Sequence, residues 1–459
     1  MSPLISALVF FFAILALFKL DADPKSRTSP ALWLSVAWLL INGSRPPTAW
    51  FESSSLVLSA QNLEEGSALD RNIYLVILIA GIIVLIGRRT KIAKILRANT
   101  TIPLFLFYCL ASTAWSDYSF VSFKRWIKLL GDFAMVLIVL TDPDRSSAIK
   151  RVLTRVAFIL VPVSVLLIKY YPELGIYYDP WSGRRMVSGV AVDKNMLGMT
   201  CLVFGLGVFF QVFSLYLDKK NRVRTRRLIA QGTILAMVFW LFHQADSMTS
   251  FSCFIMGSTV IAAMSLSKMA RKPGMVHLLV AGLVGASFST LFLHIGTGAL
   301  ETMGRNPTLT GRTEIWAGLL QFSGNPLIGT GFDSFWLGTR LQRIWAAGGQ
   351  LFGINESHNG YLETYLNLGW IGVALLAVFI VAGYRDIMRS LRQDPDVRIR
   401  LAFFVVAVIY NFTEAAFRAT CSIWFVFLLA TTAVPLVSYE RVFSTVRSNP
   451  VLQTDIVRS

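Results

Sequence analysis

Long apolar runs separated by short polar segments recur along most of the chain. The runs are continuously apolar rather than alternating, which favours helices over a transmembrane barrel. The first run has no basic segment before it and no small-residue cleavage site, so it is predicted to be a retained helix rather than a cleaved signal. The pattern predicts helices at residues 3–20, 30–42, 70–87, 100–115, 129–141, 152–170, 195–216, 228–242, 249–266, 275–297, 361–384, 400–413 and 421–437. The predicted fold is an all-α polytopic membrane protein with about 12–13 transmembrane helices.

Composition agrees with this fold, because 54% of the residues are hydrophobic and only 15% are charged. The net charge of +17 comes from basic residues in short loops between apolar runs. This distribution follows the positive-inside tendency and does not suggest nucleic-acid binding. It predicts cytoplasmic loops at 88–98, 142–155, 218–227, 267–274 and 385–400 and in the tail, and outward-facing loops at 43–69, 116–128, 171–194, 243–248, 298–360 and 411–420. The four cysteines stand singly and are expected to be packing residues.

The long outward loop divides the chain into three predicted parts. Residues 1–297 form an N-terminal helix bundle with an arginine-containing external loop at 171–194, residues 298–360 form the loop itself, and residues 361–459 form the C-terminal helices and tail. A loop of this length is expected to have internal structure or a function. Residues 311–322 read as an amphipathic helix with Gly311 as its cap, and residues 327–332 read as a glycine-punctuated turn.

Arginines on the outward side are candidates for anion binding. Arg312 lies at the start of the loop helix, where a cation is disfavoured unless an anion binds there or an acid such as Glu314 or Asp333 pairs with it. Arg184 and Arg185 lie beside Tyr177, Tyr178 and Trp181, which suit a sugar platform or an aromatic belt at the membrane interface. Either of them together with Arg312 would form an anion clamp that needs no metal.

His358 is a candidate general base. Glu356 and Glu363 could orient it, although a lone loop histidine is also a common hydrogen-bonding surface residue. The outward loops contain no metal-type pairing of Asp, Glu or His, so no metal or other cofactor is expected. Glu414 and Arg418 are expected to form a local pair. Asp132, beside Lys128 in a weakly apolar run, is the one acid that would suit a transporter.

Three motifs stand in order along the outward loop. They are Gly311-Arg312-Thr313-Glu314-Ile315-Trp316, the turn from Pro326 to Phe335, and His358-Asn359 through Gly369. This set resembles the membrane-bound O-antigen ligase and polysaccharide polymerase superfamily, over about residues 170 to 385. The resemblance implies a GT-C-like fold in a bacterial inner membrane, with the loop 298–360 as a partly helical periplasmic catalytic loop.

The resemblance also implies an activity. It is a metal-independent inverting glycosyltransferase whose donor is a glycan on undecaprenyl pyrophosphate and whose acceptor is a glycan or lipid A core. Membrane lipid and other polysaccharide-assembly proteins are the remaining expected partners. His358 would activate the acceptor hydroxyl with help from Glu356 or Glu363, and Arg312 with Arg184 or Arg185 would hold the pyrophosphate. Asn359, Trp316, Tyr361 and Trp181 are the expected glycan-binding residues.

Two alternatives stay open. Residues 357–363 and 368–372 look closest to exopolysaccharide polymerases, and Ile371, where ligases often have threonine, favours polymerase over O-antigen ligase only mildly. A transporter or flippase of an anionic lipid or glycan would use Arg184, Arg185 and Arg312 as an outer vestibule. That alternative predicts charged groups near the membrane midplane and broken helices in paired positions.

Overall fold

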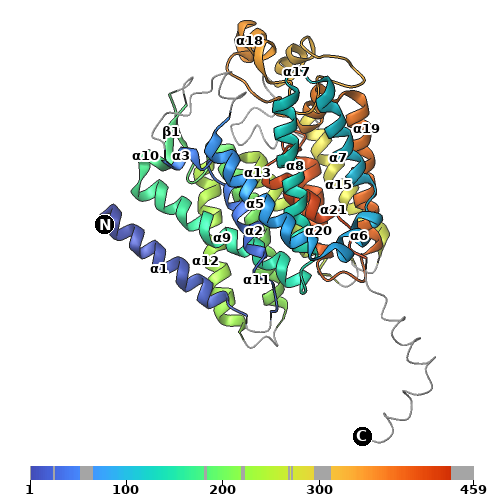
Figure 1. Cartoon of the computed structure of the whole chain (residues 1–459). Coiled ribbons are helices and arrows are strands. Elements are labelled where there is room, and N and C mark those ends of the chain that lie inside the picture. Colours follow the sequence, from blue (N-terminus) through green and yellow to red (C-terminus); the bar gives the residue numbers. More distant parts are fainter. Residues whose placement is uncertain are drawn as a thin grey trace, which may run out of the picture.

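The protein is described here by a computed structural model that covers residues 2–23, 26–51, 66–179, 183–218, 223–266, 269, 272–293 and 312–435. These residues form a helical bundle with one short antiparallel hairpin (Figure 1). The first half contains α1 (Pro3–Asp21), α2 (Leu32–Asn42), α3 (Thr48–Phe51), α5 (Ala68–Ile86), α6 (Arg89–Ala98), α7 (Thr101–Ala111), η1 (Ser112–Trp115), α8 (Ser119–Leu140), α9 (Arg145–Tyr170), α10 (Pro172–Gly175), β1 (Ile176–Tyr178) and β2 (Arg185–Val187). The second half contains α11 (Lys194–Leu217), α12 (Arg224–Ala245), α13 (Met248–Ala263), α15 (Pro273–Phe292), α17 (Arg312–Leu320), α18 (Gly338–Ala346), η2 (Gly349–Leu351), α19 (Gly360–Arg389), α20 (Val397–Tyr410) and α21 (Ser422–Thr431).

The described chain is an all-α polytopic membrane protein. Seven of its helices are long and apolar enough to cross a membrane, or eight if α6 and α7 with η1, which meet at a bend of 90°, count as one span. Every helix predicted from the apolar runs overlaps one in the structure, although the predicted ends 294–297 and 436–437 lie outside the described residues. The larger predicted number of spans also includes shorter or charged helices, namely α2, α8, α13, α20 and α21.

Helix α8 corrects one sequence prediction. It begins at Ser119, so the segment 116–128 is mostly helix rather than an outward loop. The first turns carry Lys124, Arg125 and Lys128, which hide the helix from a search for continuous apolar runs. Their side chains lie along a cleft that α8 forms with α5.

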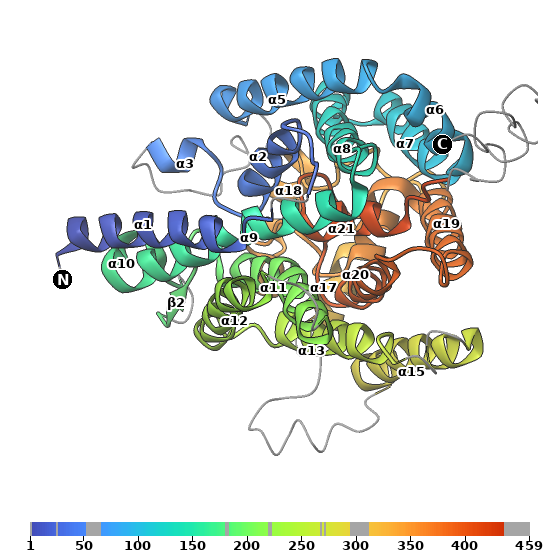
Figure 2. The same cartoon turned by 90° about the horizontal axis from the view of Figure 1, so that it is seen from below.

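The interior of the bundle contains α9, α11, α20 and α21, and Figure 2 shows α1, α5 and α15 at its periphery. Every residue of α21 is buried, whereas only 11% of the apolar span in α1 is buried. The outer helices therefore present apolar side chains such as Phe12 and Ile83 to the surroundings, as expected for contact with lipid.

Polar contacts tie the loops together at each end of the bundle. At one end Arg145 pairs with Asp394 at 2.8 Å, and Arg227 pairs with Asp21 at 3.2 Å. At the other end Arg45 donates to the carbonyl oxygen of Gly189 at 2.9 Å, which joins the loop after α2 to the loop before α11. Loops predicted to be cytoplasmic thus share one end, and the side of the membrane on which that end lies stays a prediction.

A break inside α19 receives the turn of the long loop. Gly369 has φ 63° and ψ −167°, which interrupts the helix. The freed carbonyl of Asn367 accepts the amide of Gly331 at 2.9 Å, and the freed amide of Trp370 donates to the carbonyl of Pro326 at 2.9 Å. A Cβ atom on Gly369 would lie 2.3 Å from the carbonyl of Leu327, so only glycine permits this approach. We call this contact between the turn at 326–331 and the helix break at 367–370 the joint.

Candidate functional site

The joint positions the segment that carries His358. Asn359 caps α19, because its Oδ1 accepts the amides of Tyr361 and Leu362, each at 3.0 Å. Gly360 donates its amide to the carbonyl of Asn411 at 2.9 Å, and a Cβ atom there would lie 1.9 Å from Oδ1 of Asn411. His358 itself has φ 50°, an uncommon conformation for a side chain of its size. These contacts hold the histidine against the loop between α20 and α21.

His358 lies between two carboxylates. Its Nδ1 atom is 3.0 Å from Oε1 of Glu356 and 3.5 Å from Oε2 of Glu414. Neither oxygen is aligned with the ring as a hydrogen bond, so the contact is mainly electrostatic. Nε2 makes no hydrogen bond to any described residue, and 28% of the side chain is exposed. The ring can therefore reach a substrate from its Nε2 side.

Two arginines complete the cluster. Arg312 donates to Oε1 of Glu414 at 3.2 Å and to the carbonyl of Thr413. Arg418 donates to Oε2 of Glu356 at 2.8 Å. Three separate segments thus supply a chain of alternating charge, Arg418–Glu356–His358–Glu414–Arg312, which we call the charge cluster.

The surroundings of His358 raise its pKa. Burial alone would lower its pKa, but the close contacts with the negatively charged carboxylates of Glu356 and Glu414 outweigh it and raise the pKa to about 9. The pKa of Glu356 falls to about 2, because the opposing charges of Arg418, His358 and Arg312 outweigh its burial. The histidine is accordingly a cation at neutral pH in this state.

Glu356, His358 and Glu414 also satisfy the spacing of a metal-ligand set, since one ligand atom from each lies within 4.8 Å of the others. The charges argue against a resident metal. Both carboxylates already bind a guanidinium group, and a divalent cation would have to displace Arg312 and Arg418 as well as a proton from His358. The donor set fits binding of an anion by its arginines better than binding of a metal.

The structure changes the partners expected for several charged residues. Arg312 pairs with Glu414 rather than with Glu314 or Asp333, and Arg418 pairs with Glu356. The expected local pair of Glu414 with Arg418 is therefore wrong. Sequence reasoning missed Glu414 as a neighbour of His358. The available signal was its position in a polar interruption between two apolar helices on the same predicted side as the long loop.

Glu363 has a different position from the one expected. Its Oε1 accepts Trp336 Nε1 at 2.6 Å and Asn367 Nδ2 at 3.1 Å, and its Oε2 accepts the amide of Ser357 at 3.1 Å. It forms no ion pair with His358 in the described chain. Glu363 thus fixes the backbone next to His358, and Glu356 and Glu414 are the carboxylates that contact the ring.

Three of the four residues expected to bind glycan use their polar groups inside the protein. Asn359 caps α19 and also donates to the carbonyl of Phe412 at 3.3 Å, and Trp316 Nε1 donates to the carbonyl of Ser357 at 2.8 Å. The hydroxyl of Tyr361 donates to the carbonyl of Val408 at 2.9 Å. A sugar would therefore meet ring faces rather than these polar atoms. Trp181, the fourth residue, lies outside the described residues, as does Gly311.

The expected clamp of Arg312 with Arg184 or Arg185 is not assembled in this structure. Arg185 begins β2 and pairs in register with Tyr178, and the carbonyl of Arg184 accepts the amide of Asp179. The hairpin packs on α10, α11 and α12, and Figure 1 shows it on a different side of the bundle from α17. The second guanidinium group of the charge cluster is instead that of Arg418, which pairs with Glu356.

Asp132 links the charge cluster to the bundle interior. Its Oδ1 accepts Trp38 Nε1 at 2.6 Å and Asn42 Nδ2 at 3.2 Å, and its Oδ2 accepts the amide of Thr420 at 2.8 Å. The expected proximity to Lys128 produces no ion pair within the described residues. Asp132 therefore anchors the loop that carries Glu414 and Arg418.

Comparison of the chain with models of known protein families and with curated proteins finds no match. The family resemblance noted above consequently stays a hypothesis that rests on the three loop motifs.

Proposed function

We propose that the protein is a membrane glycosyltransferase that moves a glycan from a polyprenyl pyrophosphate carrier to an acceptor hydroxyl. The observation that carries the proposal is the charge cluster. It brings a histidine with an accessible Nε2 and two guanidinium groups together at one end of the bundle. Two of the three loop motifs contribute residues to it, and the third forms the joint that positions α19. Polymerisation of a cell-surface polysaccharide at the periplasmic face of a bacterial inner membrane is the version we favour.

The reaction needs a proton acceptor and a site for the leaving group. The acceptor oxygen forms a bond to the anomeric carbon, the bond from that carbon to the pyrophosphate oxygen breaks, and the pyrophosphate leaves with the electron pair. His358 accepts the hydroxyl proton at Nε2. Arg312 and Arg418 stabilise the charge that develops on the leaving pyrophosphate, with Arg312 exchanging its bond to Glu414 for one to the anion.

The pKa of His358 gives this mechanism a pH dependence. With a pKa of about 9, only about 1% of the histidine is neutral at pH 7. If neutral His358 is the base, the transfer rate rises about tenfold per pH unit until it levels off near pH 9. A rate that falls as the pH rises through this range would instead mean that the imidazolium ion acts by stabilising the leaving group.

The deciding experiment compares surface glycan in a strain that lacks the protein and in strains that carry the wild type, His358→Ala or Glu314→Gln. Within the described part of the chain, exposed Glu314 accepts a hydrogen bond from Gln350 alone, and its variant serves as the control. Loss of long chains with persistence of single repeat units, in the deletion and His358→Ala strains alone, supports a polymerase. Long chains left on the lipid carrier with bare lipid A core support the ligase alternative. Unchanged glycan in the deletion strain refutes transfer and favours the transporter.

A further inference from the structure

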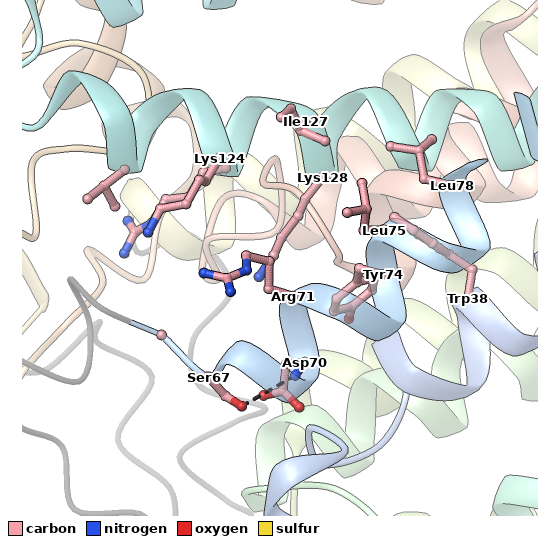
Figure 3. Close-up of a pocket in the computed structure, with 13 residues that line it drawn as sticks. Trp38, Ser67, Asp70, Arg71, Tyr74, Leu75, Leu78, Lys124, Ile127 and Lys128 are labelled. Carbon is pink, nitrogen blue, oxygen red and sulfur yellow. Dashed lines mark hydrogen bonds between the residues drawn. The ribbon is translucent and has the colours of Figure 1, made fainter.

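A basic pocket lies between α5 and α8, apart from the charge cluster. It has a volume of about 340 Å³, and Figure 3 shows Arg71, Lys124 and Lys128 extending into it from the two helices. Arg125 also lines it. Four cations from two helices therefore surround one concave space near the end of the bundle that carries α17.

The four cations are not equally neutralised. Arg125 lies 3.4 Å from Asp333, but within the described chain Arg71, Lys124 and Lys128 form no ion pair. One acid, Asp70, also lines the pocket; it lies in the first turn of α5 and accepts the amide of Thr48 at 2.9 Å. The amino-terminal end of α5 adds the positive end of its dipole to the same space. The pocket is thus electrostatically suited to an anion.

A separate apolar groove lies further along α5 and α8, toward the other end of the bundle. It has a volume of about 630 Å³, shares Leu78 with the pocket, and is lined by apolar residues of α5, α6, α7 and α8 such as Ile82, Phe107 and Phe133. On α5, Leu75 is 46% exposed and Ile82 is 43% exposed, so this part of the bundle faces lipid rather than another helix. Apart from Arg89, the residues that line the groove are apolar, so the groove suits a hydrocarbon chain.

We propose that this cleft binds one membrane lipid with a phosphate headgroup. The phosphate lies among Arg71, Lys124, Arg125 and Lys128, and a hydrocarbon chain follows the apolar groove past Leu78. A free phosphate would leave the groove without a ligand, and an uncharged lipid would leave the cations without a counter-charge. The proposal does not depend on glycosyl transfer, since it rests on the shape and charge of the cleft.

The test uses native mass spectrometry of the purified full-length chain in detergent with three probes. They are dioleoyl phosphatidic acid, dioleoylglycerol with the same chains but no phosphate, and inorganic phosphate. The expected result is one phosphatidic acid molecule per chain, held at least about tenfold more tightly than either other probe. Equal binding of dioleoylglycerol, or retention of inorganic phosphate to the same extent, would overturn the proposal.

Matched variants locate the lipid on the protein. Lys128→Gln is expected to weaken phosphatidic acid binding about fivefold, whereas Arg343→Gln, an exposed arginine on α18 outside the cleft, leaves it unchanged. Ala93→Trp places a large ring in the groove from an exposed position on α6 and weakens binding of dioleoyl but not of dihexanoyl phosphatidic acid. Equal effects of Lys128→Gln and Arg343→Gln would contradict the site. His358→Ala retains lipid binding, so failure of the proposed transfer activity remains distinguishable.

Discussion

Replacing Glu356 by glutamine tests the electrostatics of the charge cluster directly. The substitution keeps the shape of the side chain and removes one of the two negative charges beside His358. It also leaves Arg418 without its carboxylate partner, which adds a repulsive charge near the ring. Both changes favour neutral histidine, so the pKa of His358 is expected to fall.

The size of the fall follows from the contacts. The rise in the pKa of His358 from 6.5 to about 9 corresponds to a preference of about 3 kcal/mol for the protonated form. Glu356 is the nearer carboxylate, at 3.0 Å against 3.5 Å for Glu414, and burial continues to oppose the charge. Removing more than half of the favourable contribution lowers the pKa by about two units. In the variant, neutral His358 then becomes a major species near pH 7.

The chain contains only four histidines, so selective nitrogen-15 labelling and NMR titration can follow them all. The His358 signal is assigned by its disappearance in His358→Gln. Glu314→Gln removes a carboxylate that does not contact the ring and leaves the titration unchanged. A wild-type pKa at or below 6.5, or the same pKa in wild type and Glu356→Gln, would refute the reasoning.

Three further outcomes are expected. Gly369→Ala forces a side chain into a φ of 63° and against the Leu327 carbonyl, and lowers the free energy of unfolding by more than about 2 kcal/mol, measured as a lower melting temperature in detergent. Arg312→Lys loses the planar donor that spans Glu414 and the Thr413 carbonyl, and lowers kcat/KM for glycan transfer about thirtyfold. Because the folded-state pKa of His358 is raised, its contribution to stability is complete below 6.5 and disappears as the pH rises through about 9, so the melting temperature falls over this range.

Each of these outcomes has its own control. Gly282→Ala, where a Cβ atom would meet nothing within 4 Å, should leave the melting temperature unchanged or raise it slightly. Wild-type kinetics in Arg312→Lys would contradict the role given to the guanidinium group. His358→Gln should remove the loss of stability between pH 6.5 and 9. If the slope persists in that variant, another group is responsible for it.

The sequence by itself determined the elements of the bundle. Apolar runs located the long helices, because burial in lipid or in the protein interior acts on every turn of such a helix and is encoded locally in the residue order. They did not locate α6, which lies in the predicted loop 88–98, or α18, which lies in the long outward loop. The glycine-punctuated turn at 327–332 was also readable, since Gly329 and Gly331 adopt the positive φ values that such a turn requires. The helix from Arg312 to Leu320 followed from the same local signals. The predicted start of helix α8, at residue 129, lies after its actual start at Ser119. The basic residues of its first turns, which line a cleft, interrupt the apolar pattern.

Only the tertiary structure decided the charge partners. Glu414 is distant in sequence from both His358 and Arg312, and the three meet because the turn at 327–331 docks on the break in α19 and because Asp132 anchors the loop after α20. The same packing turned Glu363 toward Ser357 and placed the hairpin of Arg184 and Arg185 on α10, α11 and α12. An ion pair depends on which loops meet at the end of a helical bundle, and no local periodicity encodes that meeting.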